Sequence, residues 1–261
     1  MHYGDMTYQE IRERAASGWL AVVPTGCTEQ QGPHLPVDFD TWFAETVCLA
    51  AARVCAGQGA NVLVLPVLPF GPTPEHRNYG YGFIDLPQDL HESIVMVILQ
   101  SLAAQGFRRM VVWRGCGQHN LKRVVDNFNC EQAGQAHAVQ PEMPYAGIMR
   151  SIAPGIPGGH ADSFCTSIAL YLRPELVRVD KIPQAETTPV DWNDPALDFS
   201  CYSKSGVIGD PTRISLEFGA KLWNETVANV ARIFTTFLTD PSANADLSPL
   251  INDCNLTATP H

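Results

Sequence analysis

A short stretch between two apolar runs carries side chains that could bind a metal ion. It reads PTGCTEQQGPHLPVDFDTW over residues 24–42 and holds carboxylates, a histidine, a cysteine and several turn formers. If the chain stays extended after the apolar run at 19–24, Glu29 and Gln31 are two residues apart and point to the same face. Asp40 opens the helical pattern that follows. Because α/β proteins place their chemistry where a strand leads into a helix, this stretch is the first candidate for a site.

Three more polar clusters fall where an apolar run gives way to a loop or a helix. They cover residues 73–81, 114–120 and 158–166, in addition to 27–40. In a parallel α/β sheet, the carboxyl ends of neighbouring strands face one common crevice. We therefore expect the four clusters to meet and form one site.

Alternating helical and strand patterns predict the scaffold. Thr7 and Glu10 have the spacing of a capping box, which starts a helix. Apolar residues at helical spacing predict helices, and short continuous apolar runs predict buried strands. The expected helices are 7–17, 40–56, 88–105, 120–131, 161–172 and 212–238, and the expected strands are 19–24, 61–71, 110–113 and one within 136–150. Such alternation needs crossover connections, so it predicts a parallel sheet covered on both faces.

Composition narrows the class of protein. The chain has 261 residues, 45% of them apolar, so we expect one domain over 1–240 and a surface tail over 241–261. The formal net charge is −10 and the 17 basic residues form no run, which argues against nucleic acid or an anionic membrane as a partner. Without a signal peptide or an apolar run of ~18 residues, a cytoplasmic location is expected. The eight cysteines lack regular spacing and are expected to be reduced thiols.

Five motifs of this sequence resemble those of one enzyme family. PTGCTEQQGPHLPVDFD is similar to the Gly-Ser-x-Glu-Gln-His-Gly-Pro-His-Leu-Pro…Asp stretch of the creatininase (creatinine amidohydrolase) family, and GPTPEH to its Gly-x-Ser-x-Glu-His loop. WRGCGQHN falls where the family has Asn-Gly-His-x-x-Asn. GGHADSFCTS resembles His-Ala-Gly-x-x-Glu-Thr-Ser, and GVIGDPT resembles Gly-Val-x-Gly-Asp-Pro. Their order and separation agree from about residue 19 to 220, so the resemblance covers most of the chain.

The resemblance implies a fold, an assembly and a chemistry. The implied fold is an α/β three-layer sandwich with a mostly parallel sheet between helices, and the implied assembly is a homo-hexamer. The implied reaction is hydrolysis of a C–N bond in a cyclic amide or formamide at a two-metal centre. In such a centre one ion lowers the pKa of a bridging water, and the other polarises the carbonyl group.

This sequence differs from the family pattern at the metal ligands themselves. Glu29 and Asp40 match the family's first glutamate and its bridging aspartate. Gln31 stands where the family has a ligand histidine. An ungapped reading puts Cys116 on the second ligand histidine and Gln118 on a ligand glutamate. Because an amide is a poor substitute for imidazole or carboxylate at a transition metal, these changes predict the loss of the second metal site.

The ligand positions that remain predict one zinc ion. Glu29, Asp40 and Cys116 could hold Zn²⁺, because thiolate and carboxylate are good zinc ligands. Shifting the third motif by one residue places His119 on the ligand glutamate, which makes His119 a candidate fourth ligand. The register of residues 114–120 stays open at this stage.

The leading hypothesis is a creatininase-like enzyme that acts on the C–N bond of a small amide, lactam or formamide, by hydrolysis or by cyclisation. His160 is the predicted general acid or base, with Cys116 and Glu29 as the other catalytic groups. Residues 180–205, rich in Pro, Asp and Thr, either pass over the site or form a subunit contact. The predicted substrate contacts are Thr73, Glu75, His76, Tyr79 and Gln118.

Two alternatives use the same scaffold differently. Cys27, Cys116 and Cys165 lie in the converging motifs, so a metal-free enzyme could use a thiolate nucleophile that an imidazole activates. Cys116 with His160 is the better pair for that role, and His34 is either an active-site or a structural histidine. The other alternative is a non-catalytic relative that binds a ligand after losing its metal centre.

The sequence also predicts which other cysteines are buried and how the two carboxyl groups ionise. Cys48, Cys55 and Cys130 lie on helical faces and are expected to be core residues. In a crevice without metal, Glu29 and Asp40 face each other and the pKa of one carboxyl rises. With zinc bound, both carboxylates stay ionised and the ligand thiol becomes a thiolate.

Overall fold

The computed structural model describes residues 1–240, and the expected surface tail over 241–261 lies outside the described residues. Its central sheet runs in the order β2-β1-β3-β4, and every pair of neighbouring strands is parallel. The strands are β1 (Leu20–Thr25), β2 (Val62–Val64), β3 (Arg109–Arg114) and β4 (His137–Val139). The parallel sheet predicted from the alternating pattern is therefore confirmed.

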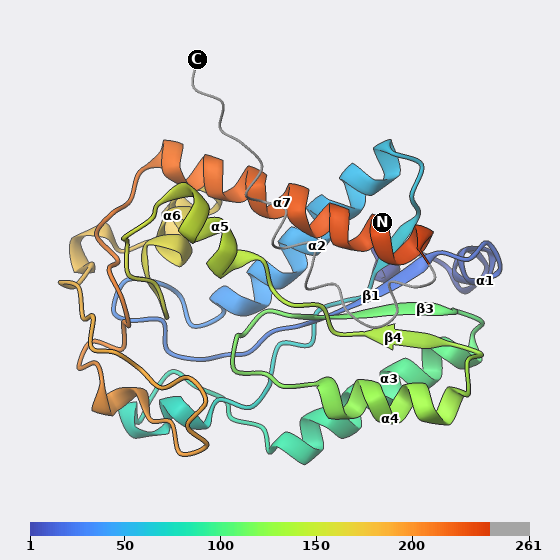
Figure 1. Cartoon of the computed structure of the whole chain (residues 1–261), viewed down its shortest axis with the longest axis horizontal. Coiled ribbons are helices and arrows are strands. Elements are labelled where there is room, and N and C mark those ends of the chain that lie inside the picture. The colour runs from blue at the N-terminus through green and yellow to red at the C-terminus, as the bar shows by residue number, and fades with distance from the viewer. Residues whose placement is uncertain (241–261) are drawn as a thin grey trace.

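Helices cover both faces of this sheet, which gives the predicted three layers (Figure 1). In Figure 1, α2, α5, α6 and α7 lie on one side of the sheet, and α3 and α4 lie on the other. The helices are α1 (Tyr8–Ala16), α2 (Phe39–Gly57), α3 (Gln88–Ala104), α4 (Lys122–Gln132), α5 (Tyr145–Ile152), α6 (Ser163–Leu172) and α7 (Leu216–Thr239).

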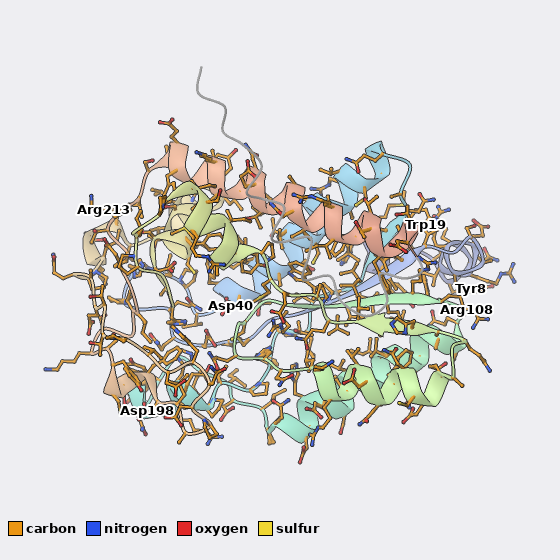
Figure 2. All side chains as sticks on the ribbon, in the orientation of Figure 1. Tyr8, Trp19, Asp40, Arg108, Asp198 and Arg213 are labelled. Carbon is orange, nitrogen blue, oxygen red and sulfur yellow. The ribbon has the colours of Figure 1, made fainter. Side chains whose placement is uncertain are left out.

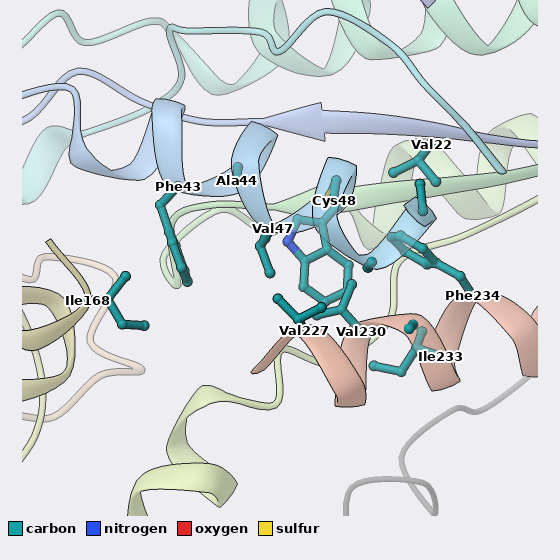
Figure 3. Packing of buried hydrophobic residues seen from close by; sticks show 14 of the residues in the cluster. Val22, Phe43, Ala44, Val47, Cys48, Ile168, Val227, Val230, Ile233 and Phe234 are labelled. Carbon is teal, nitrogen blue, oxygen red and sulfur yellow. The ribbon is translucent and has the colours of Figure 1, made fainter. Parts of the chain in front are cut away.

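The sheet is apolar on both faces because a layer of helices packs against each. In β1, Val22 belongs to the cluster with α2 and α7, whereas Val23 belongs to the cluster with α3 and α4. In Figure 3, Val47 of α2 and Val230 of α7 point into the space between these two helices. Removing such side chains from water stabilises the fold by roughly 25 cal/mol per Å² of apolar surface, so the packing holds α2 firmly against the sheet.

The first helix confirms its predicted start, and the core confirms two of three predicted cysteines. The Oγ1 of Thr7 accepts the Glu10 amide at 3.4 Å, and the Glu10 carboxylate accepts the Thr7 amide at 2.7 Å. Cys48 and Cys55 are fully buried. Cys130, by contrast, is exposed, so its predicted core position is wrong; it lies on the solvent side of α4.

Two predicted strands are shorter in the structure than the sequence pattern indicates. The strand expected over 61–71 ends at Val64, since Pro66 and Pro69 have no amide hydrogen for the ladder. Within 136–150 the predicted strand is only His137–Val139, and α5, which the sequence pattern did not indicate, follows it.

Two helices begin later than their periodicity predicts. Ala161 has a left-handed backbone (φ 51°), so α6 starts only after Asp162, whose carboxylate caps it at the Phe164 and Cys165 amides. Helix α7 starts after Ser215, whose hydroxyl accepts the Phe218 amide at 3.0 Å. Among the described helices, none has both the length and the apolar content needed to span a bilayer.

The sheet brings the ends of β1 and β3 together. The two strands are neighbours, with Thr25 opposite Arg114, so the residues that follow each strand leave at the same edge. Helix α2 starts at this edge too, and Asp40 in its first turn lies near the middle of the molecule (Figure 2). The predicted clusters at 27–40 and 114–120 therefore meet.

Candidate active site

A cavity of about 520 Å³ opens where the chain leaves β1 and β3. Its polar end holds carboxylates, a thiol and an imidazole, and its other walls are largely apolar. The polar lining residues at this end are Glu29, Gln31, Asp40, Glu75, Cys116, Gln118 and His160, and Arg150 and Asp162 also line the cavity.

Three side chains that could ligate a metal gather around Glu29: Cys27, Asp40 and Cys116. The Cys27 thiol lies 3.1 Å from Glu29 Oε2 and 3.4 Å from Asp40 Oδ2, and the Cys116 thiol lies 3.7 Å from Glu29 Oε2. One ligand atom from each of these four residues lies within 4.8 Å of the others, and all four residues are buried. The predicted set Glu29, Asp40 and Cys116 is thus brought together, and Cys27 completes it.

Gln31 bridges the two carboxylates. Its Nε2 donates to Glu29 Oε1 at 3.2 Å and to Asp40 Oδ2 at 2.9 Å. Glu29 and Gln31 therefore do turn their side chains to one place. The Gln31 Oε1 is buried without a hydrogen-bond partner, which leaves a free acceptor beside the carboxylates.

Burial makes negative charge costly at this end of the cavity. It raises the pKa of Asp40 well above the usual range, and the nearby Glu29 carboxylate adds to the effect. Burial also raises the pKa of Glu29. The pKa increase expected for two facing carboxyls without metal is thus confirmed.

Both thiols have raised pKa values in this environment. The Cys27 hydrogen bond lowers the pKa of Cys116, but burial and the neighbouring carboxylates outweigh it and raise that pKa to about 12. Burial likewise raises the pKa of Cys27, with Cys116 and the carboxylates adding to it.

The residues present fit a divalent metal ion. Two thiols and two carboxylates are zinc ligands, and their mutual repulsion when ionised is what a cation offsets. The orphaned Gln31 Oε1 adds an acceptor at the same place.

Two imidazoles also approach the Glu29 carboxylate. His76 Nε2 lies 3.3 Å from Glu29 Oε2, and His160 Nδ1 lies 3.5 Å from Glu29 Oε1. The two rings are tilted against each other with centroids 4.8 Å apart. Burial lowers the pKa of His76, and burial with the neighbouring His76 lowers that of His160 to about 3. The predicted acid or base His160 thus lies at the cavity, beside Glu29.

His119 belongs to a different group. One of its ring nitrogens lies within 4.8 Å of the Cys27 and Cys116 thiols, but Glu29 and Asp40 are not in that group. Its Nε2 donates to the Pro72 carbonyl at 3.2 Å. The structure therefore does not group His119 with the carboxylates, and the fourth member of that group is Cys27.

The predicted substrate contacts divide into two sets. Glu75 and Gln118 line the cavity, and burial raises the pKa of Glu75 to about 7, helped by the Glu29 carboxylate. Thr73, His76 and Tyr79 are not among the lining residues, although His76 lies directly behind the lining residue Glu29 at 3.3 Å. Tyr79, for example, donates its hydroxyl to the Ser203 carbonyl at 2.8 Å.

Two other predicted candidates have clear places. His34 bonds the Thr166 hydroxyl at 2.8 Å, and burial lowers its pKa to about 4, which fits the structural reading of this histidine. Cys165 lines the cavity on α6, but burial raises the pKa of its thiol well above the usual range.

The segment 180–205 passes over the site, which was one of its two predicted roles. Trp192 and Phe199 line the cavity, and the Phe199 ring lies 4.9 Å from the His76 ring and 5.3 Å from the His160 ring. Other apolar lining residues come from α5, α6 and the loops beside them: Met143, Tyr145, Met149, Ile156 and Phe164.

Sequence reasoning missed Cys27 as a member of the carboxylate group. The signal was present, because Cys27 precedes Glu29 by two residues, the same spacing that placed Gln31 beside Glu29. Gln30, which lies between His76 and His160, had no such signal, since its partners come from distant segments.

Comparison with known proteins identifies the family. The model of the creatininase family, described as creatinine amidohydrolase, matches residues 4–234. The mycofactocin precursor peptide peptidase of Mycobacterium ulcerans is 29% identical over 228 residues, covering 83% of this chain and 86% of that protein. The creatinine amidohydrolase of Pseudomonas putida is 27% identical over 219 residues, covering 72% of this chain and 79% of that protein.

Solved creatininase structures share the fold. A manganese creatininase aligns with a TM-score of 0.78 at 22% identity, covering 91% of this chain and 98% of that one. A mutant creatininase of Zn-Zn type aligns with the same TM-score at 23% identity and the same coverage. With the family model spanning nearly all of the described residues and this fold confirmed, the chain belongs to the creatininase family of amidohydrolases.

Proposed function

We propose that the protein hydrolyses, or forms in reverse, the C–N bond of an amide with the help of one zinc ion. The main support for this proposal is a buried group at the polar end of the cavity, in a chain of the creatininase family. The group consists of Cys27, Glu29, Asp40 and Cys116. When bound, zinc supplies Lewis-acid activation of the amide carbonyl and of a water molecule.

The chain's own residues supply the proton transfers. His160 reaches the cavity with Nδ1 beside Glu29, and its lowered pKa of about 3 keeps the ring neutral, so it starts as a proton acceptor. Glu75 lines the same cavity with a pKa of about 7, so part of it is protonated near neutral pH and can donate to the departing nitrogen.

The cavity favours a substrate with an apolar group beside the scissile bond. Its volume of about 520 Å³ falls in the range of sites that enclose small organic ligands, and Tyr145, Met149 and Trp192 supply apolar wall. Among its relatives are a peptide peptidase and a creatinine amidohydrolase, which both cleave C–N bonds. We therefore propose a small amide, lactam or formamide that carries an apolar substituent.

Metal analysis combined with turnover tests this function. Protein purified without chelator is expected to contain close to one zinc per chain and to hydrolyse members of a panel of lactams, formamides and short peptides. A chelator should abolish turnover and added zinc should restore it. Less than about a tenth of an equivalent of transition metal, with turnover intact, would contradict the zinc part.

The metal-free cysteine mechanism has weaker support. The Cys116 thiol contacts Glu29 rather than donating to an activating imidazole, and its pKa of about 12 disfavours the thiolate. Alkylation of Cys116 in chelated, active protein would revive that mechanism if it removed the activity.

A further inference from the structure

Gln30 lies between the two imidazoles and contacts both. Its side-chain Nε2 is 3.0 Å from His76 Nδ1 and 3.4 Å from His160 Nε2, and its backbone carbonyl oxygen is 2.8 Å from His160 Nε2. Its side chain also meets two backbone groups: Oε1 accepts the Gly32 amide at 2.9 Å, and Nε2 donates to the Gly206 carbonyl at 3.0 Å. The residue is buried.

The two backbone contacts fix which end of the Gln30 amide is which. An amide N–H only donates, so the atom facing Gly32 must be the oxygen, and a carbonyl only accepts, so the atom facing Gly206 must be the nitrogen. The assignment therefore does not depend on the histidines. Gly206 has a left-handed backbone (φ 84°), and a Cβ there would lie 1.9 Å from Gln30 Oε1, so only glycine permits this close approach.

The segment over the site holds Gly206 in place. The Gly206 amide donates to the Ser203 hydroxyl at 2.9 Å, and that hydroxyl donates to Glu186 Oε1 at 3.1 Å. Glu186 also accepts the amides of Lys204 and Ser205 at 2.9 and 3.1 Å. Gln30 is thus fixed from both sides by backbone that other residues anchor.

With the amide fixed, the proton positions on both rings follow. Gln30 Nε2 donates one hydrogen to Gly206 and the other to His76 Nδ1, so His76 carries its proton on Nε2, which faces Glu29 at 3.3 Å. His160 Nε2 lies 2.8 Å from the Gln30 carbonyl, which only accepts, and 3.4 Å from Gln30 Nε2, whose two hydrogens have shorter partners, so Nε2 carries a proton. Its Nδ1 is the nitrogen that faces Glu29 at 3.5 Å.

We propose that Gln30 is a positioning residue that gives His76 and His160 the same tautomer but opposite roles. His76 turns its N–H toward Glu29, whereas His160 turns its unprotonated Nδ1 toward Glu29. One consequence concerns metal. Glu29, His76 and His160 have ligand atoms within 4.8 Å of one another, but a metal at His76 Nε2 would leave that ring without any proton. The contacts of Gln30 therefore disfavour a second metal ion at His76 Nε2.

Histidine nitrogen NMR of the whole chain tests the proposal without a substrate, so its failure is distinct from failure of the proposed hydrolysis. Protein labelled with ¹⁵N-histidine, with and without one equivalent of zinc, is measured by magic-angle spinning. His76→Gln and His160→Gln identify the two sets of signals. In wild type we expect a protonated Nε2 on both rings and an unprotonated Nδ1 on His76. A protonated His76 Nδ1, or loss of the His76 Nε2 proton on adding zinc, would overturn the proposal.

Gln30→Glu separates the two contacts of Gln30. A carboxylate cannot donate to His76 Nδ1, so His76 is expected to move its proton to Nδ1, while His160 keeps its Nε2 proton because its partner is backbone. The exposed Gln58→Glu makes the same charge change and should leave both rings unchanged. If Gln30→Glu does not fold, Gln30→Met replaces it, and a mixture of His76 tautomers is then expected. An unaltered His76, or a change in His160 together with His76, would show that Gln30 does not set the tautomers.

Discussion

Glu29 belongs to two groups of side chains, called here the thiol side and the imidazole side, that satisfy their polar groups in different ways. On the thiol side, Cys27, Cys116 and Asp40 surround it, all buried, with thiol contacts between 3.1 and 3.7 Å. Ionising this side would place several negative charges together. On the imidazole side, His76 and His160 each have a partner from Gln30.

The difference teaches that ligand distances alone do not define a metal site. Both sides contain groups whose ligand atoms lie within 4.8 Å of one another. The thiol side gathers negative charge when it ionises, which a cation would offset, whereas Gln30 supplies a hydrogen bond to each imidazole. The following changes are expected to affect one side and spare the other.

Asp40→Asn should have the largest effect, because it removes a ligand from the thiol side. We expect zinc to be lost from the purified protein and turnover to fall well beyond the ~10–100-fold typical of outer-sphere changes. Elemental analysis and steady-state kinetics measure both. Asp38→Asn, two residues away and outside the cavity lining, is the matched control and should keep its zinc. Full zinc occupancy in Asp40→Asn would remove Asp40 from the ligand set.

The stability of metal-free protein should depend on pH through the buried carboxyls. Glu75 has a folded-state pKa of about 7, above its ordinary 4.5, so its neutral form favours the folded state. The stability that neutral Glu75 contributes is therefore fully present below pH ~4.5 and is lost as the pH rises through ~7. The raised pKa values of Glu29 and Asp40 act in the same direction.

Glu75→Gln should remove part of this pH dependence. At pH 8 we expect the variant to be more stable than wild type by up to about 3 kcal/mol, and at pH 4 to be equal to it. Urea unfolding at both pH values measures the difference, with exposed Glu13→Gln as control. Equal stability of the two proteins at pH 8 would contradict the neutral Glu75.

Cobalt substitution should show how many thiolates bind the metal on the thiol side. Cobalt bound by Cys27 and Cys116 gives a thiolate charge-transfer band, which is expected to fall by about half in Cys27→Ser and in Cys116→Ser. His119→Gln should leave the band intact, because His119 is not grouped with the carboxylates. An undiminished band in Cys27→Ser, with a weakened one in His119→Gln, would restore the ligand set predicted from sequence.

Glu186→Gln should have the smallest effect and should touch only the imidazole side. Glu186 anchors residues 203–205 through hydrogen bonds near the surface, so its replacement is expected to cost on the order of 1 kcal/mol of unfolding free energy. Zinc affinity, measured by competition with a chelating dye, should stay within a factor of about two. A large drop in zinc affinity would mean that the two sides are not independent.

Most of the scaffold could be predicted because its signals are local. Capping residues, helical spacing and apolar runs predicted every strand position and all helices except α5. The errors came from single residues: Pro66 and Pro69 shorten β2, and the left-handed Ala161 delays α6. Each effect depends on the backbone of a single residue, and a periodic pattern over many residues does not reveal it.

The site was predictable only in part because its contacts join distant segments. The i, i+2 spacing placed Glu29 beside Gln31, and parallel strand ends brought Cys116 to them. No spacing rule could show that Tyr79 turns to Ser203, or that Gln30 reaches Gly206 across 176 positions of the chain. Such contacts depend on the path of the segment over the site.

The cavity draws its reactive end and its apolar walls from different parts of the chain. The reactive end follows β1 and β3, whose strands are fixed in the core, whereas Trp192 and Met149 come from a surface segment and from a short helix. Mutations in those walls leave the strand ends untouched. Related proteins could therefore change substrate through mutations in the cavity walls while they keep the same reactive residues. A library of variants confined to residues 143–156 and 190–199 would test this directly.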